Sequence, residues 1–138
     1  LQEEYFKHLQ IESRTLGDLV HNHIIPSAIK YQSVMSENLL RLKALLPEAT
    51  FKKTCKEQLD IIEELSERIS MALRLVEEMT EARKKANTIE SARERALAYC
   101  DTVKPFLSSI RYEVDKMELI VDNETWPLPK YRELLYIR

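Results

Sequence analysis

Glycine scarcity constrains this chain more strongly than any other feature of its sequence. The 138 residues include a single glycine, Gly17, whereas an average usage of about 7% would supply about ten. Sheet proteins need glycine, asparagine and aspartate at their many turns, so this composition does not suit strands. The apolar share of 44% and the net charge of only −2 still allow a hydrophobic core. The sequence therefore predicts an all-α fold, in a single helical domain that covers residues 1–138.

The charges and the cysteines restrict the partners and the cellular setting. With 21 basic and 23 acidic residues, the chain lacks the strongly basic face that nucleic acids require. It also has no stretch that approaches the ~20 consecutive apolar residues of a membrane span. Cys55 and Cys100 each fall on an apolar stripe, which favours reduced, buried thiols over a disulfide or a reactive site. We therefore expect a cytoplasmic protein with neither nucleic acid nor a membrane as its partner.

Apolar residues at three- and four-residue spacing predict the first long helix. The pattern begins near Thr15, where Thr15 and Asp18 resemble a capping box, and it continues into a leucine-rich stretch. A separate helical segment of moderate amphipathicity is expected before it, over residues 1–14. Pro26 lies inside the run and cannot donate a backbone hydrogen bond, so we expect a kink or a short break near His23.

Two further stripes predict a second and a third helix. Pro47 is expected at the first position of the second helix, where proline is tolerated. The heptad stripes of the second helix are Cys55, Ile62, Ile69 and Val76, and Leu65, Ala72, Met79 and Ala86. Asn87, with Glu90 three residues later, is the expected cap of the third helix, which Pro105 should bend. Because the connections are short, successive helices are expected to be antiparallel neighbours.

The predicted architecture is an elongated antiparallel bundle of three long helices, with an N-terminal helical segment and a proline-rich C-terminal hook. The hook covers residues 124–138 and contains the string WPLP, which no helix can pass through. Five of its residues are candidates for interface or docking contacts, because Trp, Tyr and Arg anchor many interfaces. These candidates are Trp126, Tyr131, Arg132, Leu134 and Leu135. The alternative is a hook that caps the core of its own domain, and we expect Trp126, Leu134 and Leu135 to face the bundle.

A search for catalytic, cofactor and metal sites yields no candidate residue. His21 and His23 point about 200° apart on a helix, so they cannot share a metal ion. With Asp18, His21 forms only one weak variant of the Glu-x-x-His pair that di-metal bundles use twice. Nucleophiles normally sit on sharp, glycine-bearing turns, and phosphate loops need several glycines. We therefore predict no catalytic, cofactor-binding or metal-binding residue in this chain.

One basic cluster leaves two interpretations open. Arg83, Lys84 and Lys85 are consecutive, and Arg93 and Arg95 follow. Such a cluster could bind phosphate. Its interleaving with glutamates is more typical of a solvated helix face, which is the interpretation we favour.

Several stretches resemble type III glutamine synthetases. The string WPLPKYRELL at residues 126–135 is rare, and it is similar to the C-terminal end of that family. Residues 10–32, 81–87 and 98–122 are similar to the family as well, so the resemblance extends over nearly the whole chain. It implies a non-catalytic C-terminal helical domain, cut from a larger chain, with a structural or assembly role.

The resemblance also implies a parent enzyme and its partners. Type III glutamine synthetases make glutamine from glutamate, ammonia and ATP with divalent metal ions, Mg or Mn, in ring-shaped homo-oligomers. Their metal and nucleotide sites lie in a catalytic domain that has no counterpart here, so this fragment is expected to be inactive alone and to bind neither ATP nor metal. The expected partners are the catalytic domain of the same chain and neighbouring subunits, which Tyr131 and Arg132 would face.

Two other classes of function are compatible with a helical bundle. One is a stand-alone helical module that binds a partner protein in a groove. The other is a small helical enzyme with arginine, lysine and glutamate inside the bundle, as in chorismate-mutase-like folds. The chain begins at Leu1, without methionine and already within a helical pattern, which favours a piece of a longer protein over both alternatives.

Overall fold

The computed structural model describes residues 2–128, which are helical and contain no strand. The elements are α1 (Gln2–Leu19), the π-helical turn η1 (Val20–Ile24), α2 (Ile25–Leu45), α3 (Glu48–Thr54), α4 (Lys56–Asn87), α5 (Ala92–Ala98), the π-helical turn η2 (Tyr99–Val103) and α6 (Lys104–Ile120). The prediction of an all-α fold is confirmed. None of the described helices combines the length and the apolar character that crossing a bilayer requires.

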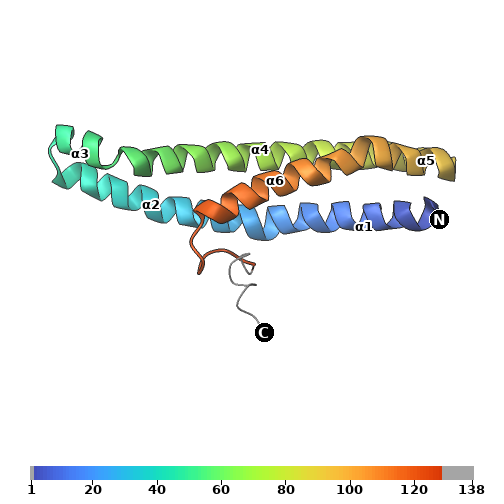
Figure 1. The fold of residues 1–138 in the computed structure, drawn as a ribbon, viewed down its shortest axis with the longest axis horizontal. Coiled ribbons are helices and arrows are strands. Elements are labelled where there is room, and N and C mark those ends of the chain that lie inside the picture. The colour runs from blue at the N-terminus through green and yellow to red at the C-terminus, as the bar shows by residue number, and fades with distance from the viewer. Residues whose placement is uncertain (1, 129–138) are drawn as a thin grey trace.

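The helices follow one another along a single long axis (Figure 1). The chain runs out through α1, η1 and α2, turns at α3, and returns along α4. It turns again at α5, and α6 then runs back only as far as the junction of α1 with α2. α4 contacts α2 over one part of its length and α6 over another. The molecule thus has a body, in which α1, α4 and α6 pack together, and an arm, which we define as residues 31–62.

Proline explains both π-helical turns. In an α-helix the ring of Pro26 would clash with the carbonyl four residues earlier and leave it without a donor. In η1 the backbone hydrogen bonds span five residues instead of four, and the amide of Ile25 donates to the carbonyl of Val20. The same arrangement recurs before Pro105, where the amide of Lys104 donates to the carbonyl of Tyr99. The structure therefore has a π-helical turn before each proline in place of the kink or short break expected near His23, and the helix continues through both.

Two expected helix boundaries differ from the structure. No helix starts at Thr15, because α1 runs unbroken from Gln2 to Leu19 along one apolar face. The second helix is interrupted at Cys55, and Pro47 is the N-cap of α3 rather than its first residue. At the interruption the Thr54 hydroxyl donates to the carbonyl of Thr50 at 2.8 Å, a local bond that is associated with helix bending.

The expected cap of the third helix is also wrong. Asn87 ends α4, and its Oδ1 accepts a hydrogen bond from the buried Tyr99 hydroxyl at 2.7 Å. Ser91 caps α5 instead, since its Oγ accepts the amide of Glu94 at 3.3 Å. A serine with glutamate three residues later is the usual capping pair, so the third helix begins one turn later than expected.

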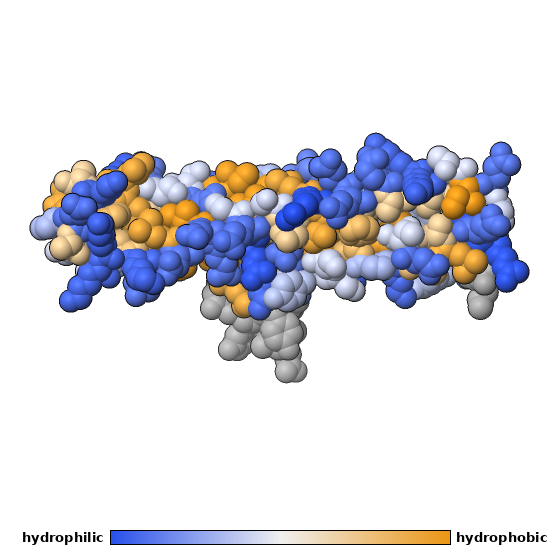
Figure 2. All heavy atoms as spheres, turned by 90° about the horizontal axis from the view of Figure 1, so that it is seen from above, coloured by the Kyte–Doolittle hydropathy of each residue, from blue (hydrophilic) through white to orange (hydrophobic). Residues whose placement is uncertain are grey.

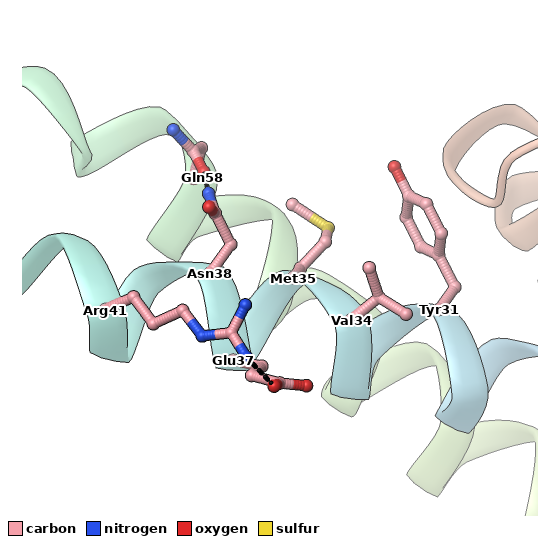
Figure 3. A pocket seen from close by; sticks show the side chains of 7 residues that line it. All are labelled: Tyr31, Val34, Met35, Glu37, Asn38, Arg41 and Gln58. Carbon is pink, nitrogen blue, oxygen red and sulfur yellow. Dashed lines mark hydrogen bonds and ion pairs between the residues drawn. The ribbon is translucent and has the colours of Figure 1, made fainter.

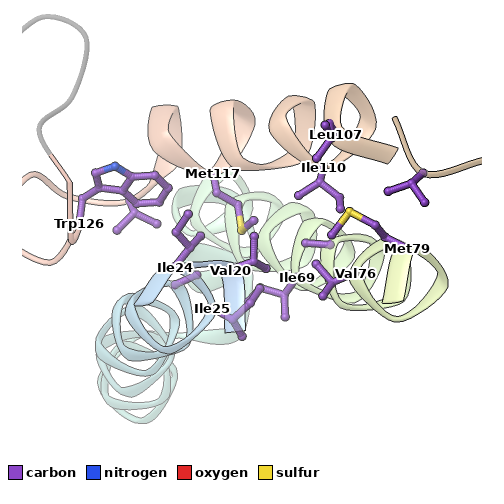
Figure 4. Close-up of a cluster of buried hydrophobic side chains, with 14 of the residues drawn as sticks. Val20, Ile24, Ile25, Ile69, Val76, Met79, Leu107, Ile110, Met117 and Trp126 are labelled. Carbon is purple, nitrogen blue, oxygen red and sulfur yellow. The ribbon is translucent and has the colours of Figure 1, made fainter. Parts of the chain in front are cut away.

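The core lies along the seam between α1, α4 and α6 (Figure 4). Both π-helical turns contribute to it, because Val20, Ile24, Tyr99 and Val103 are fully buried. The predicted stripes of the second helix are confirmed in the core apart from Ile62, which is half-buried. A charged pair lies at the edge of this core, where a guanidinium nitrogen of Arg68 on α4 is 3.3 Å from Oε1 of the nearly buried Glu113 on α6.

Trp126 closes the core at the end of α6. Asp122 forms the turn before it: its Oδ1 accepts the amide of Glu124 at 2.9 Å, and its Oδ2 accepts the hydroxyl of Thr125 at 2.6 Å. The indole is 5% exposed and lies beside Ile24 and Met117 (Figure 4). The expectation that Trp126 packs on the bundle is confirmed.

We predict that the Gly17→Ala substitution stabilises the domain. Gly17 lies inside α1, and an added methyl group would contact Met79 and Val76 at an ordinary 3.7 Å. Because alanine restricts the unfolded chain and favours helix, the free energy of unfolding should rise by about 0.5–1 kcal/mol. Urea unfolding followed by circular dichroism measures it. The larger Gly17→Leu variant should lose stability by overpacking, and a less stable alanine variant would contradict the prediction.

We predict that Trp126→Ala lowers the free energy of unfolding by about 3–5 kcal/mol, since the ring is almost completely buried. Trp126→Phe keeps an aromatic ring and should cost less. Both are measured by urea unfolding. Iodide should quench the fluorescence of this sole tryptophan weakly in the folded wild-type chain. Strong quenching, or an alanine variant as stable as the wild type, would show that Trp126 does not belong to the core.

Candidate interaction surface

The arm presents an apolar face that no described element covers. In the body, Val20 and Ile24 lie beside Met117 of α6 (Figure 4). Beyond the end of α6, the apolar residues of α2 continue at helical spacing into the arm. Other apolar residues of α2, beside that stripe, are exposed in the arm, with 63% of Val34 and 78% of Leu45 accessible to solvent. The core stripe of α2 therefore stays at least half-buried in the arm, and a second set of apolar residues beside it faces solvent.

A shallow groove of about 450 Å³ lies on this face. It is lined by Tyr31, Val34, Met35, Glu37, Asn38, Arg41 and Gln58 (Figure 3). The Nδ2 group of Asn38 donates to the side-chain Oε1 of Gln58 at 3.5 Å and so links α2 with α4 across the groove, while the Arg41 guanidinium pairs with Glu37 at 2.5 Å. An apolar strip with charged and amide groups beside it is typical of a protein contact.

The base of the arm is fixed by one side chain. Gln32 of α2 donates through Nε2 to the carbonyl of Ile62 at 3.1 Å and to the Ser66 hydroxyl at 2.5 Å, both on α4. Towards the far end, Leu39 and Cys55 are buried between the two helices. These contacts hold the arm as a defined hairpin, and Figure 2 shows apolar residues gathered on its surface near the α3 end.

The histidines do not come together. His8, His21 and His23 are all exposed, and His21 and His23 lie on the π-helical turn η1. Within residues 2–128, no group of three or more His, Cys, Asp or Glu side chains is arranged to hold a metal ion. Both thiols are free, as expected, and Cys55 is buried, whereas Cys100 is only half-buried.

The basic cluster divides into residues with different surroundings. Lys84 pairs with Glu81 at 3.5 Å on the surface. Arg95 donates to the carbonyl of Ile89 at 2.8 Å and lies over the Phe6 ring. Arg83 differs from both, because it is partly buried and lines a pocket with Arg14 of α1. Sequence reasoning missed Arg14, which no local pattern connects with the cluster.

The predicted docking residues are only partly visible. Trp126 lies in the core, and a contact between Trp126 and another domain or subunit stays a prediction. Tyr131, Arg132, Leu134 and Leu135 lie outside the described residues, as does most of the expected hook at 124–138. The exposed residues of the arm were not among the sequence candidates. No sequence signal identified them, because their exposure results from the helical segments over residues 2–45 running further than those over residues 92–120.

Comparisons with known proteins agree with the resemblance noted in the sequence. The family model of the glutamine synthetase C-terminal domain matches residues 1–43. A glutamine synthetase of Bacteroides fragilis is 48% identical over 99% of this chain. A type-3 glutamine synthetase of Dictyostelium discoideum is 25% identical over 100% of it, and a glutamine synthetase of Butyrivibrio fibrisolvens is 24% identical over 99%.

These relatives are much longer than the chain, which spans 19% of the length of each. The similarity is therefore to one part of those enzymes, and the family model that matches here describes their C-terminal domain. The chain belongs to the glutamine synthetase family, as a C-terminal domain of that family.

Proposed function

We propose that this chain is the non-catalytic helical C-terminal domain of a type-3 glutamine synthetase and that it acts in the packing and assembly of that enzyme. The parent enzyme would join ammonia to glutamate at the expense of ATP, in the cytoplasm. The proposal is carried by one observation: the arm extends beyond the body and exposes an apolar face along α2.

The assignment to type 3 is supported by two similarities. The string WPLPKYRELL resembles the end of type III enzymes, and the Dictyostelium relative, named type-3, aligns over the whole chain. We further propose the expected architecture for the complete domain, an elongated antiparallel bundle of three long helical segments followed by a hook at 124–138. Its partners would be the catalytic domain of the same chain and neighbouring subunits.

The described residues do not fit ATP or its metal ions. Divalent magnesium or manganese needs several oxygen ligands that converge on one point, and residues 2–128 provide no such cluster. A nucleotide would also need backbone amides at a glycine-rich turn, whereas the one glycine lies within α1. We therefore assign no step of the ligation to these residues and place ATP and metal in the parent's catalytic domain.

The shape of the chain supports a role in contacts. Its accessible surface is 9532 Å², about a quarter more than the roughly 7,500 Å² of a compact monomer of this mass. A long hairpin with an exposed apolar stripe has a large surface that a partner can bury. The rim of the groove supplies amides and an ion pair that give such a contact its direction.

We predict that the purified 138-residue chain is enzymatically inactive. It should show no γ-glutamyl transfer and no calorimetric ATP binding tighter than millimolar, because it lacks a phosphate loop and a carboxylate cluster. The full-length enzyme assayed in parallel is the positive control. Transfer activity or tight ATP binding by the chain alone would overturn the non-catalytic assignment.

We predict that Val34→Asp and Leu45→Asp separate folding from assembly. Both side chains are mostly exposed, so the stability of the isolated chain should change by no more than about 0.5 kcal/mol. In the full-length enzyme, each charge would be buried in a contact, and light scattering should show partial dissociation. Leu119→Asp on α6 is the matched control, since that residue is 79% exposed and lies outside the groove. Full assembly of both arm variants would refute the role of the arm.

A further inference from the structure

A small pocket of about 260 Å³ lies between α1 and α4, at the end of the body away from the arm. It is lined by Gln10, Arg14, Arg83, Lys84 and Asn87. Three of these five side chains are cations and none is an acid. The pocket therefore has a concentrated positive charge in a protein whose net charge is −2.

Arg83 is the unusual member of this set. Its Nε is buried and has no hydrogen-bond partner within the described residues. Burial lowers the pKa of Arg83; Tyr99 opposes this effect in part, and the neighbouring Arg14 charge adds a smaller lowering. No ion pair to either arginine is formed within residues 2–128, although Lys84 is paired with Glu81. A buried donor on a cation, with a second guanidinium beside it, is costly unless an anion completes the site.

The neutral residues of the pocket also present donors. The Oδ1 of Asn87 accepts the hydroxyl of Tyr99 at 2.7 Å, and Tyr99 is itself fully buried. This bond fixes the orientation of the Asn87 side-chain amide, so its Nδ2 group is available to donate a hydrogen bond to a ligand. The other half of the pocket is supplied by Gln10 and Arg14, which lie one helical turn apart on α1.

We propose that this pocket binds a phosphate group, either free or carried as a monoester on a small molecule. Planar guanidinium groups match the oxygens of phosphate in bidentate geometry, and charge-assisted bonds of this kind are stronger than neutral ones. The pocket is smaller than the ~300–1,000 Å³ typical of drug-sized ligands, so it suits one phosphate group rather than a nucleotide. The site is independent of the assembly role proposed for the arm.

The test is titration of the 138-residue chain with inorganic phosphate at constant ionic strength, which is held with sodium chloride. Calorimetry should give a saturable isotherm with one site, and the midpoint of thermal unfolding should rise with phosphate concentration. A second titration with glycerol phosphate distinguishes a free ion from a monoester. Binding of either anion supports the proposal and identifies the source. A response that is no larger than that to chloride overturns it, as does tighter binding of succinate than of phosphate.

Variants connect the binding with the two arginines. Arg14→Gln and Arg83→Gln should each weaken phosphate binding about tenfold or more. Lys85→Gln removes the same charge from an exposed position on the same helix, outside the pocket, and should leave binding within about twofold. Since Arg14 is exposed, its variant will fold even if that of Arg83 does not. In chloride alone, Arg14→Gln should raise the unfolding midpoint by removing a like charge. Equal phosphate binding by Arg14→Gln and Lys85→Gln would overturn the site.

Discussion

The geometry of this domain depends on how two helices accommodate an internal proline. At Pro26 and Pro105 the chain has no amide to donate, and an ordinary α-helix would break or kink sharply there. Here each helix widens for five residues just before the proline, so the amide ahead of it bonds five residues back. The axis therefore continues, and the first and last residues of each wider turn, Val20 and Ile24, Tyr99 and Val103, pack fully into the core. The turns before Pro26 and Pro105, where the sequence suggests that the helices break, thus contribute side chains to the core of the body.

Much of the fold was predictable because its determinants are local. The single glycine and the heptad of α4 act through neighbouring residues, and each led to a confirmed expectation. The two prolines also act locally, but they produce π-helical turns where a kink or break was expected. The cap of α5 was not predictable in the same way, because Asn87 and Ser91 both precede a glutamate by three residues. The choice is made by Tyr99, whose hydroxyl engages Asn87 from the next helix. Local patterns cannot include such a tertiary partner.

The candidate sites depended still more on tertiary structure. The sequence directed attention to aromatic residues near the C-terminus, and Trp126 became part of the core because the Asp122 turn directs it back onto the bundle. The arm is exposed because of a difference in length between helical segments, which is visible only when they are placed side by side. The pocket at Arg83 needs Arg14 from a distant part of the chain. In each case the role of a residue depends on neighbours in space that are distant in the sequence.

The arm and the body therefore differ in how much packing stabilises their helices. A helix in a globular protein is stabilised mainly by packing of its apolar face, and in the arm the face of α2 has only α4 and the short α3 to pack against. Full burial of an aliphatic side chain contributes about 1.5–3 kcal/mol, so covering the exposed Val34 and Leu45 would add several kcal/mol. That amount is a substantial fraction of the stability of a typical domain, about 5–15 kcal/mol. A partner on this face would consequently stabilise the arm as much as the arm stabilises the contact, and folding of the arm and assembly would be coupled.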